Sequence, residues 1–130
     1  MKKEIRIEVY NKCGGKCAYC GEGIEIKAMQ VDHMIPKRNF ISHIKNKHRV
    51  PKFLDHLTES DLDNIDNLYP SCRKCNNFKG SESLEGFRSE LSQQLYRANK
   101  TSVNYRMAKK YGQITEHPKP IIFYFEKNLY

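Results

Sequence analysis

The chain contains five cysteines, four of which stand at positions where they could bind a metal ion. Four of them form two Cys-x-x-Cys pairs, Cys17 with Cys20 and Cys72 with Cys75. A spacing of two residues directs both sulfur atoms at one ion, so two such pairs complete the tetrahedral site that zinc prefers. A redox-active Cys-x-x-Cys motif would need only one pair. We therefore predict a structural zinc ion held by four cysteines, with Cys13 as a free thiol.

Polar residues between and after the two pairs could perform hydrolysis. Asp32 and His33 end a segment rich in β-forming residues, Asn67 precedes the second cysteine pair, and Asn76 follows it directly. A histidine titrates near neutral pH and suits a general base. Carboxylate and amide oxygens favour hard ions such as Mg²⁺ or Mn²⁺. Taken singly, each residue also has a structural explanation: strand end, surface histidine, turn asparagine or helix cap.

In this order the motifs resemble those of the HNH endonuclease family. The resemblance covers residues 5–80 and rests on four motifs: Cys17-x-x-Cys20, Val31-Asp32-His33-Met34-Ile35-Pro36, Asp66-Asn67-Leu68 and Cys72-x-x-Cys75-Asn76-x-x-Lys79-Gly80. It implies an α+β protein with a ββα-metal core, in which a hairpin and a helix surround a catalytic metal. A four-cysteine zinc site would brace this core.

The resemblance also implies a role for each site residue. His33 takes the role of the general base that activates water, and Asp32 that of a metal ligand. Asn67 matches the central asparagine, which steadies the loop and the base. Asn76 matches the last motif position, where many members have histidine, and would hold a Mg²⁺ or Mn²⁺ ion together with Asp32. Two neighbouring asparagines fit the spacing less well: Asn64 and Asn77.

The expected activity is metal-dependent hydrolysis of DNA phosphodiester bonds that leaves 5′-phosphate and 3′-hydroxyl ends. With one active site per chain, a monomer would nick one strand, and a double-strand break would need a homodimer or two visits. One alternative is a zinc-braced DNA-binding module with a weak or inactive site. Others are a nuclease subunit that acts only with a protein partner, and a zinc-containing interaction protein with no nucleic-acid role.

The charge of the chain favours a nucleic-acid partner. Lys and Arg number 23 against 15 Asp and Glu, a formal net charge of +8, which four thiolates and one Zn²⁺ would lower to about +6. A basic chain suits a polyanion, although a lysine-rich surface alone would explain the charge. Basic residues gather in an insertion over 37–58, which we interpret as a flexible phosphate-binding arm or a solvated loop. The predicted DNA-binding residues are Lys37, Arg38, Lys45, Lys47, Arg49, Lys52, Arg73 and Lys79.

Local patterns predict the elements that position these residues. Alternating apolar residues over 24–36 predict a β-hairpin with Asp32 and His33 at the end of its second strand. Ser71 and Gly80 bracket a short helix that carries the second cysteine pair. The first residues alternate as in a strand, but the resemblance favours a helix there. Further predicted elements are helices over 82–99 and 102–111 and an apolar strand over 121–125.

The length of 130 residues and the mass of 15.3 kDa suit a single domain. We divide it into a nuclease core at 5–80, including the insertion at 37–58, and a C-terminal extension of helices and a strand at 81–130. No apolar run is long enough to cross a bilayer. Because no apolar stretch follows Met1, we expect no secretory signal and a cytoplasmic protein.

Overall fold

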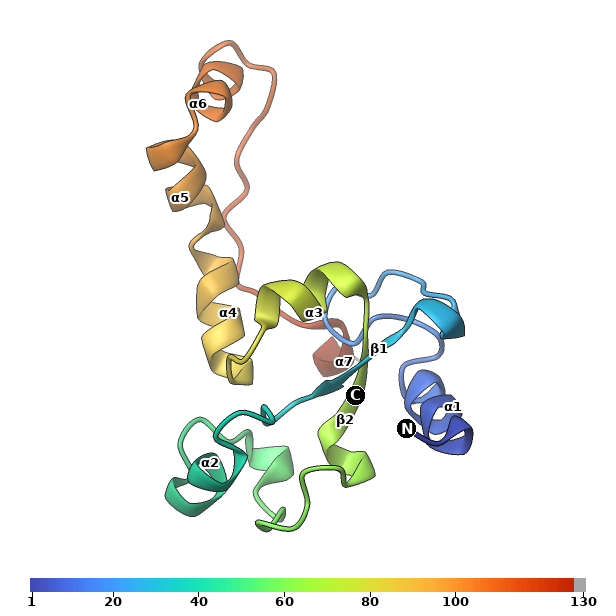
Figure 1. The fold of residues 1–130 in the computed structure, drawn as a ribbon. Helices are drawn as coiled ribbons and strands as arrows, with labels where there is room; N and C mark the ends of the chain where they lie inside the picture. The colour runs from blue at the N-terminus through green and yellow to red at the C-terminus, as the bar shows by residue number, and fades with distance from the viewer. Residues whose placement is uncertain (128–130) are drawn as a thin grey trace. The chain divides into compact units, whose positions relative to one another are not determined.

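The computed structural model describes residues 1–127, which divide into two compact units. The larger unit comprises 1–87 and the described residues from 122 onward, and the smaller comprises 88–121. Residues 128–130 of the predicted extension lie outside the described residues. Along the chain (Figure 1) the helices and strands are α1 (Lys3–Lys12), β1 (Gln30–His33), α2 (Phe40–Asn46), β2 (Leu68–Ser71), α3 (Arg73–Lys79), α4 (Leu84–Ser92), α5 (Gln94–Thr101), α6 (Val103–Lys110) and α7 (Tyr124–Lys127). The predicted α+β class is confirmed.

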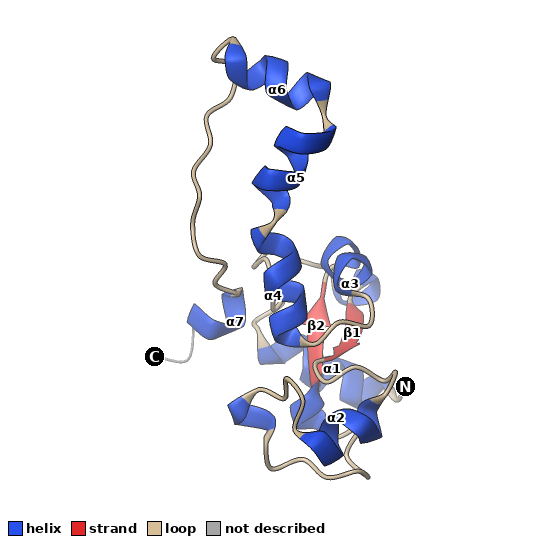
Figure 2. Cartoon of the chain, turned by 90° about the vertical axis from the view of Figure 1, so that its left-hand side faces the viewer, coloured by secondary structure: helices blue, strands red, loops and turns tan. Residues whose placement is uncertain are grey.

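Strands β1 and β2 form an antiparallel pair (Figure 2), in which Asp32 lies opposite Tyr69 and His33 opposite Leu68. The predicted hairpin within 24–36 is wrong. Residues 26–28 form a 3-10 turn instead of a first strand, and β1 pairs with residues almost forty positions later. The apolar residues before β1 serve the core: Met29 is buried against Val9 and Leu68.

Helix α3 follows β2 after a single residue, so the strand pair and this helix form the ββα unit. Cys72 is the N-cap, where its Sγ accepts a hydrogen bond from the backbone N–H of Cys75 at 3.4 Å. Gly80 ends the helix with φ of 55°, a conformation that a residue with a Cβ atom rarely adopts. The predicted short helix is confirmed, with the cap at Cys72 instead of Ser71.

The N-terminal segment is a helix, as the family resemblance implied. α1 buries Val9 at the centre of a core cluster, and Ile5 packs on the same cluster one turn earlier. The side chain of Lys12 donates hydrogen bonds to the backbone carbonyls of Ile65 and Leu68 at 2.6 and 2.7 Å. α1 therefore holds the start of β2 in place.

The predicted strand over 121–125 is wrong. This segment is irregular up to Phe123 and then forms the short helix α7. Phe123 and Phe125 are buried and pack edge-on against the ring of Tyr19, with centroids 5.3 and 6.3 Å away. Ile122 is 56% exposed, so this segment does not have the two buried faces that the predicted strand would have. The rings of Tyr19, Phe123 and Phe125 pack together in the core. These contacts bury the apolar side chains without pairing the segment to a strand.

Two further segments differ from the sequence expectation. The predicted helix over 82–99 breaks at Gln93 into α4 and α5. The insertion over 37–58, for which the sequence predicts a flexible arm or a solvated loop, contains α2, whose Phe40 and Ile44 side chains are buried. The predicted helix over 102–111 is confirmed as α6, with Ser102 as the N-cap. Over residues 1–127, no helix is both long and apolar enough to cross a membrane.

Candidate active site and metal centre

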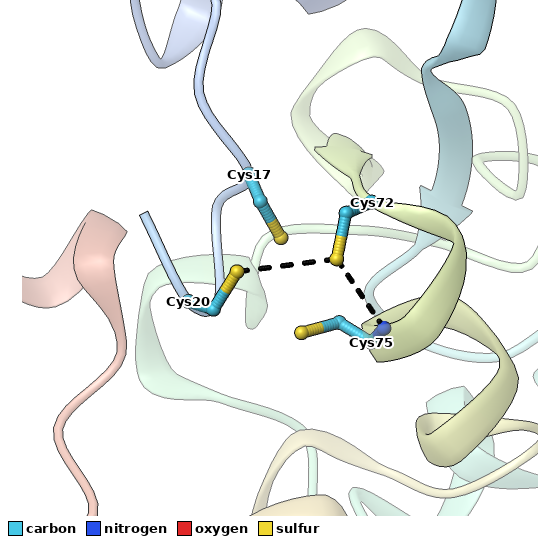
Figure 3. Close-up of side chains that lie close together, drawn as sticks. All are labelled: Cys17, Cys20, Cys72 and Cys75. Atoms are coloured by element: carbon cyan, nitrogen blue, oxygen red, sulfur yellow. Dashed lines mark hydrogen bonds between the residues drawn. The ribbon is translucent and has the colours of Figure 1, made fainter. Parts of the chain in front are cut away.

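Four cysteine side chains from two distant segments point toward one another (Figure 3). Cys17 and Cys20 come from the loop after α1, whereas Cys72 and Cys75 come from the start of α3. Their sulfur atoms all lie within 4.8 Å of one another, and the Sγ atoms of Cys20 and Cys72 are 3.9 Å apart. Zinc–sulfur bonds of about 2.3 Å in a tetrahedron place the sulfurs about 3.8 Å apart. The four cysteines therefore could hold one zinc ion, as the sequence predicts.

The thiols of the cysteine cluster differ in acidity. Hydrogen bonding with the Cys75 thiol holds the pKa of Cys17 well below its usual range. Burial raises the pKa of Cys20 to about 11, so these two thiols differ strongly in acidity. A bound dication would stabilise the thiolate at every position. Cys13 is half-buried outside this cluster, and burial raises the pKa of its thiol.

Three of the predicted catalytic and metal-binding residues line one small cleft of about 170 Å³. Asp32 and His33 reach it from the end of β1, and Asn76 from the middle of α3. The cleft also includes Lys37 and Arg38 from the start of the insertion. The structure thus brings a histidine, two groups with oxygen donors and two exposed cations to one place.

The carboxylate of Asp32 is buried among polar partners. It accepts a hydrogen bond from the Tyr19 hydroxyl, and Lys79 Nζ lies 3.2 Å from Oδ2 and 3.4 Å from Oδ1. Burial raises the pKa of Asp32, and the Lys79 ammonium opposes that rise. Sequence reasoning missed Tyr19, although its place between two zinc-ligand candidates could have drawn attention to it.

Lys79 is buried, with a side chain that is 0% exposed. Its ammonium group also donates a hydrogen bond to the backbone carbonyl of His33 at 3.1 Å. This burial corrects the prediction that Lys79 contacts DNA. The motif spacing puts position 79 near the end of α3, but only the packing of α3 on β1 shows that the side chain turns inward.

Asn67 lies behind the cleft and not in it. Its side chain is fully buried; Oδ1 accepts a hydrogen bond from the backbone N–H of Ile35 at 2.8 Å. Its Nδ2 donates to the carbonyls of Ile35 and Leu62, at 3.2 and 2.9 Å. The amide thereby joins the segment just after His33 to the loop that precedes β2.

The imidazole of His33 is one-fifth exposed and has one carboxylate partner. Its Nε2 lies 2.8 Å from Oδ1 of Asp63, a residue that is largely exposed. Asp63 was not among the predicted site residues. It stands in a polar turn with three other acidic or amide residues, and nothing in the local sequence distinguishes it from them.

The remaining candidates lie outside the cleft. Asn64 caps a turn by accepting a hydrogen bond from the N–H of Asp66 at 2.9 Å, and Asn77 is exposed beside Asn76. Lys45 lies 3.9 Å from Glu59, and Lys47 donates to the carbonyl of Asp55 at 2.9 Å. The other predicted DNA-binding residues outside the cleft are also exposed: Arg49, Lys52 and Arg73.

The donors in the cleft fit a hard divalent cation. Asp32 and Asn76 both offer oxygen, which Mg²⁺ and Mn²⁺ prefer. Lys79 neutralises part of the Asp32 charge, so a metal held here would also draw on water and on phosphate oxygens of the substrate.

Comparison with known proteins gives one result. A family model described as HNH endonuclease matches residues 17–82. The match begins at the first cysteine of the four-sulfur cluster and ends just after α3, so it includes the cluster and every side chain that lines the cleft. No curated protein and no solved structure matches the chain.

Proposed function

This chain belongs to the HNH endonuclease family, and on that basis we propose that it hydrolyses DNA phosphodiester bonds in the cleft between β1 and α3. One observation carries the proposal. Asp32 and His33 from the end of β1 and Asn76 from α3 line the same cleft together with two cations. Phosphodiester hydrolysis needs these parts: a proton acceptor, oxygen ligands for a metal, and positive charge that holds phosphates.

His33 acts as the general base in this proposal. Its imidazole takes the proton of a water molecule as the water oxygen bonds to phosphorus and the bond to the leaving oxygen breaks. The leaving oxygen takes a proton from solvent and becomes the 3′-hydroxyl. Asp32 and Asn76 would hold a Mg²⁺ or Mn²⁺ ion, which supplies positive charge to the phosphoryl oxygens when bound. Asn67 holds the backbone after His33 through its bonds to Ile35 and so fixes the direction of the base.

The four-cysteine site acts as a structural zinc centre. It joins the loop of Cys17 and Cys20 to the first turn of α3, and Asn76 follows Cys75 directly. The same loop places Tyr19 against the carboxylate of Asp32. Zinc would therefore fix both oxygen donors of the cleft without taking part in the reaction.

The exposed cations of the insertion and of α3 provide the contacts to DNA. Lys37 and Arg38 lie in the cleft and would hold phosphates on either side of the scissile bond. Contacts to phosphates do not distinguish one DNA sequence from another. We therefore expect binding that weakens with salt and that shows no recognition sequence. With one cleft per chain, the expected product is nicked DNA with a 5′-phosphate and a 3′-hydroxyl.

Supercoiled plasmid tests the proposal. We expect nicking in Mg²⁺ or Mn²⁺ and none in EDTA. Asn76→Ala should lower the rate, whereas Asn77→Ala, a change of the same type one residue away and outside the cleft, should leave it unaltered. Cutting that survives chelation, or that only Ni²⁺ or Zn²⁺ restores, would contradict the proposed metal site. Plasmid that stays intact but is shifted on a native gel would instead favour a DNA-binding module.

A further inference from the structure

We infer that Asp63 is the positioning residue of His33, an inference that rests on the proposed function. The carboxylate oxygen Oδ1 of Asp63 lies 2.8 Å from Nε2 of His33. Asp63 does not line the cleft, so it would act through the imidazole and not on the substrate. It comes from the loop before β2, thirty residues away in the sequence.

The buried side chain of Asn67 links the two backbone segments that carry His33 and Asp63. The buried side chain of Asn67 bonds to the backbone of Ile35, two residues after His33, and to the carbonyl of Leu62, directly before Asp63. One side chain thus fixes the two segments that carry the pair. An exposed ion pair normally adds little to stability, because two long side chains lose conformational freedom when they pair. Here the backbone on each side is already fixed, and both side chains are short.

The loop that carries Asp63 is also ordered by its own hydrogen bonds. The carboxylate of Asp61 accepts bonds from the N–H and the hydroxyl of Thr58, at 2.7 and 2.9 Å. The N–H of Asn64 donates to the carbonyl of Asp61 at 3.0 Å. Asp63 therefore stands on a formed turn, which limits the positions that its carboxylate can reach.

This contact determines which nitrogen of His33 can act as the base. A proton on Nε2 that is donated to Asp63 leaves Nδ1 unprotonated, ready to accept a proton from water. When the ring takes the proton of water, Nε2 keeps its bond to Asp63, so the ring stays in place as the water oxygen bonds to phosphorus and the leaving oxygen departs. Asp63 would thereby set both the tautomer and the direction of the ring.

A second pair in the same loop provides a matched control. Nε2 of His56 lies 2.9 Å from Oδ2 of Asp66, and both side chains are about half exposed. Neither residue lines the cleft. Removal of Asp66 deletes the same kind of contact at a similar distance, three positions from Asp63, without touching the proposed base.

The kinetic test compares Asp63→Ala, Asp63→Asn, Asp63→Glu and Asp66→Ala on supercoiled plasmid at saturating Mn²⁺. We expect Asp63→Ala to lower kcat by about 10- to 100-fold with KM unchanged. Asp63→Asn should fall between Ala and wild type, and Asp63→Glu should recover most of the rate, because it restores the charge. Asp66→Ala should stay within about twofold of wild type. An unchanged kcat in Asp63→Ala, or a defect that extra Mn²⁺ removes, would overturn the inference.

A spectroscopic readout does not depend on cutting. In ¹H–¹⁵N spectra of the histidine rings, the Nε2 resonance of His33 should show a bond to a carboxylate and should move toward that of a free imidazole in Asp63→Ala. The His56 resonance in Asp66→Ala calibrates the size of this change. If wild type fails to cut plasmid while the His33 resonance moves as expected, the proposed function fails and the pairing stands. A His33 resonance that is identical in wild type and Asp63→Ala would overturn the pairing itself.

Discussion

The ammonium group of Lys79 forms a buried ion pair with the carboxylate of Asp32, with Nζ 3.2 Å from Oδ2. Lys79 stands on the last turn of α3 and Asp32 near the end of β1, so the pair locks the helix to the strand. Asn76 lies one turn earlier on the same helix. The ion pair therefore sets the distance between the two oxygen donors of the cleft.

Lys79→Met should destabilise the fold, because it leaves the Asp32 carboxylate buried without its cation. Breaking one side of such a pair costs about 3–5 kcal/mol. Urea unfolding of wild type and variant measures the loss. The exposed neighbour Lys74→Met should change the free energy of unfolding by less than about 0.5 kcal/mol. If Lys79→Met keeps full stability and instead weakens DNA binding, the side chain faces solvent after all.

Cys72→Ser should abolish zinc binding and cooperative unfolding, because the serine hydroxyl can still cap α3 but cannot replace the predicted thiolate ligand of zinc. Metal analysis of the purified wild type should find about one zinc ion per chain. Cys13→Ser is the matched control: this thiol lies outside the four-sulfur cluster, and its loss should leave the zinc content unchanged. Zinc-free wild type, or a Cys72→Ser variant that folds normally, would refute the zinc site.

Lys37→Gln and Arg38→Gln should each weaken binding to a short DNA duplex and reduce its dependence on salt. Each removed phosphate contact should lower the slope of log Kd against log salt by about 1. Fluorescence anisotropy in EDTA measures binding without cutting. Lys27→Gln removes an exposed lysine outside the predicted DNA-binding set and should leave the slope as it is. Equal slopes for all the proteins would mean that the cleft cations do not contact phosphate.

Glu116 should stabilise the α5–α6 pair at neutral pH but not in strong acid. Hydrogen bonds from Tyr105 and Asn99, together with Lys109, lower the pKa of Glu116 from 4.5 to about 2. A carboxyl with a lowered pKa contributes stability that is present above its unfolded pKa and lost as the pH falls through the folded value. The difference in Tm between wild type and Glu116→Gln should therefore be largest above pH 5 and vanish near pH 2. A difference that is constant with pH would contradict these contacts.

Short-range patterns in the sequence predicted much of the site. The two-residue spacing of the cysteines and the glycine after α3 indicate local geometry, because the atoms involved lie within one or two turns of the backbone. The motif order placed Asp32, His33 and Asn76, which the structure brings together in one cleft. The family match over 17–82 confirms the resemblance from which the roles of these residues were inferred.

Contacts between distant segments could not be predicted in this way. The partner of β1 is β2, and paired residues such as Asp32 and Tyr69 lie far apart in the sequence. No local pattern encodes that choice of partner or register. The inward turn of Lys79 depends on how α3 packs, and the approach of Asp63 to His33 depends on the buried amide of Asn67. The run over 121–125 predicts a buried strand because it is apolar on both faces, but side chains that pack in a cluster of aromatic rings produce the same pattern.

The rate of plasmid nicking by His33→Ala tests the central claim most directly. Wild type and variant are compared at equal concentration in Mn²⁺, with His56→Ala as a control that removes another partly exposed histidine, one also bonded to an aspartate. The account predicts that His33→Ala loses nicking by about 10²- to 10⁴-fold, as expected for removal of a general base, while His56→Ala cuts like wild type. A His33→Ala protein that nicks plasmid at the wild-type rate would contradict it.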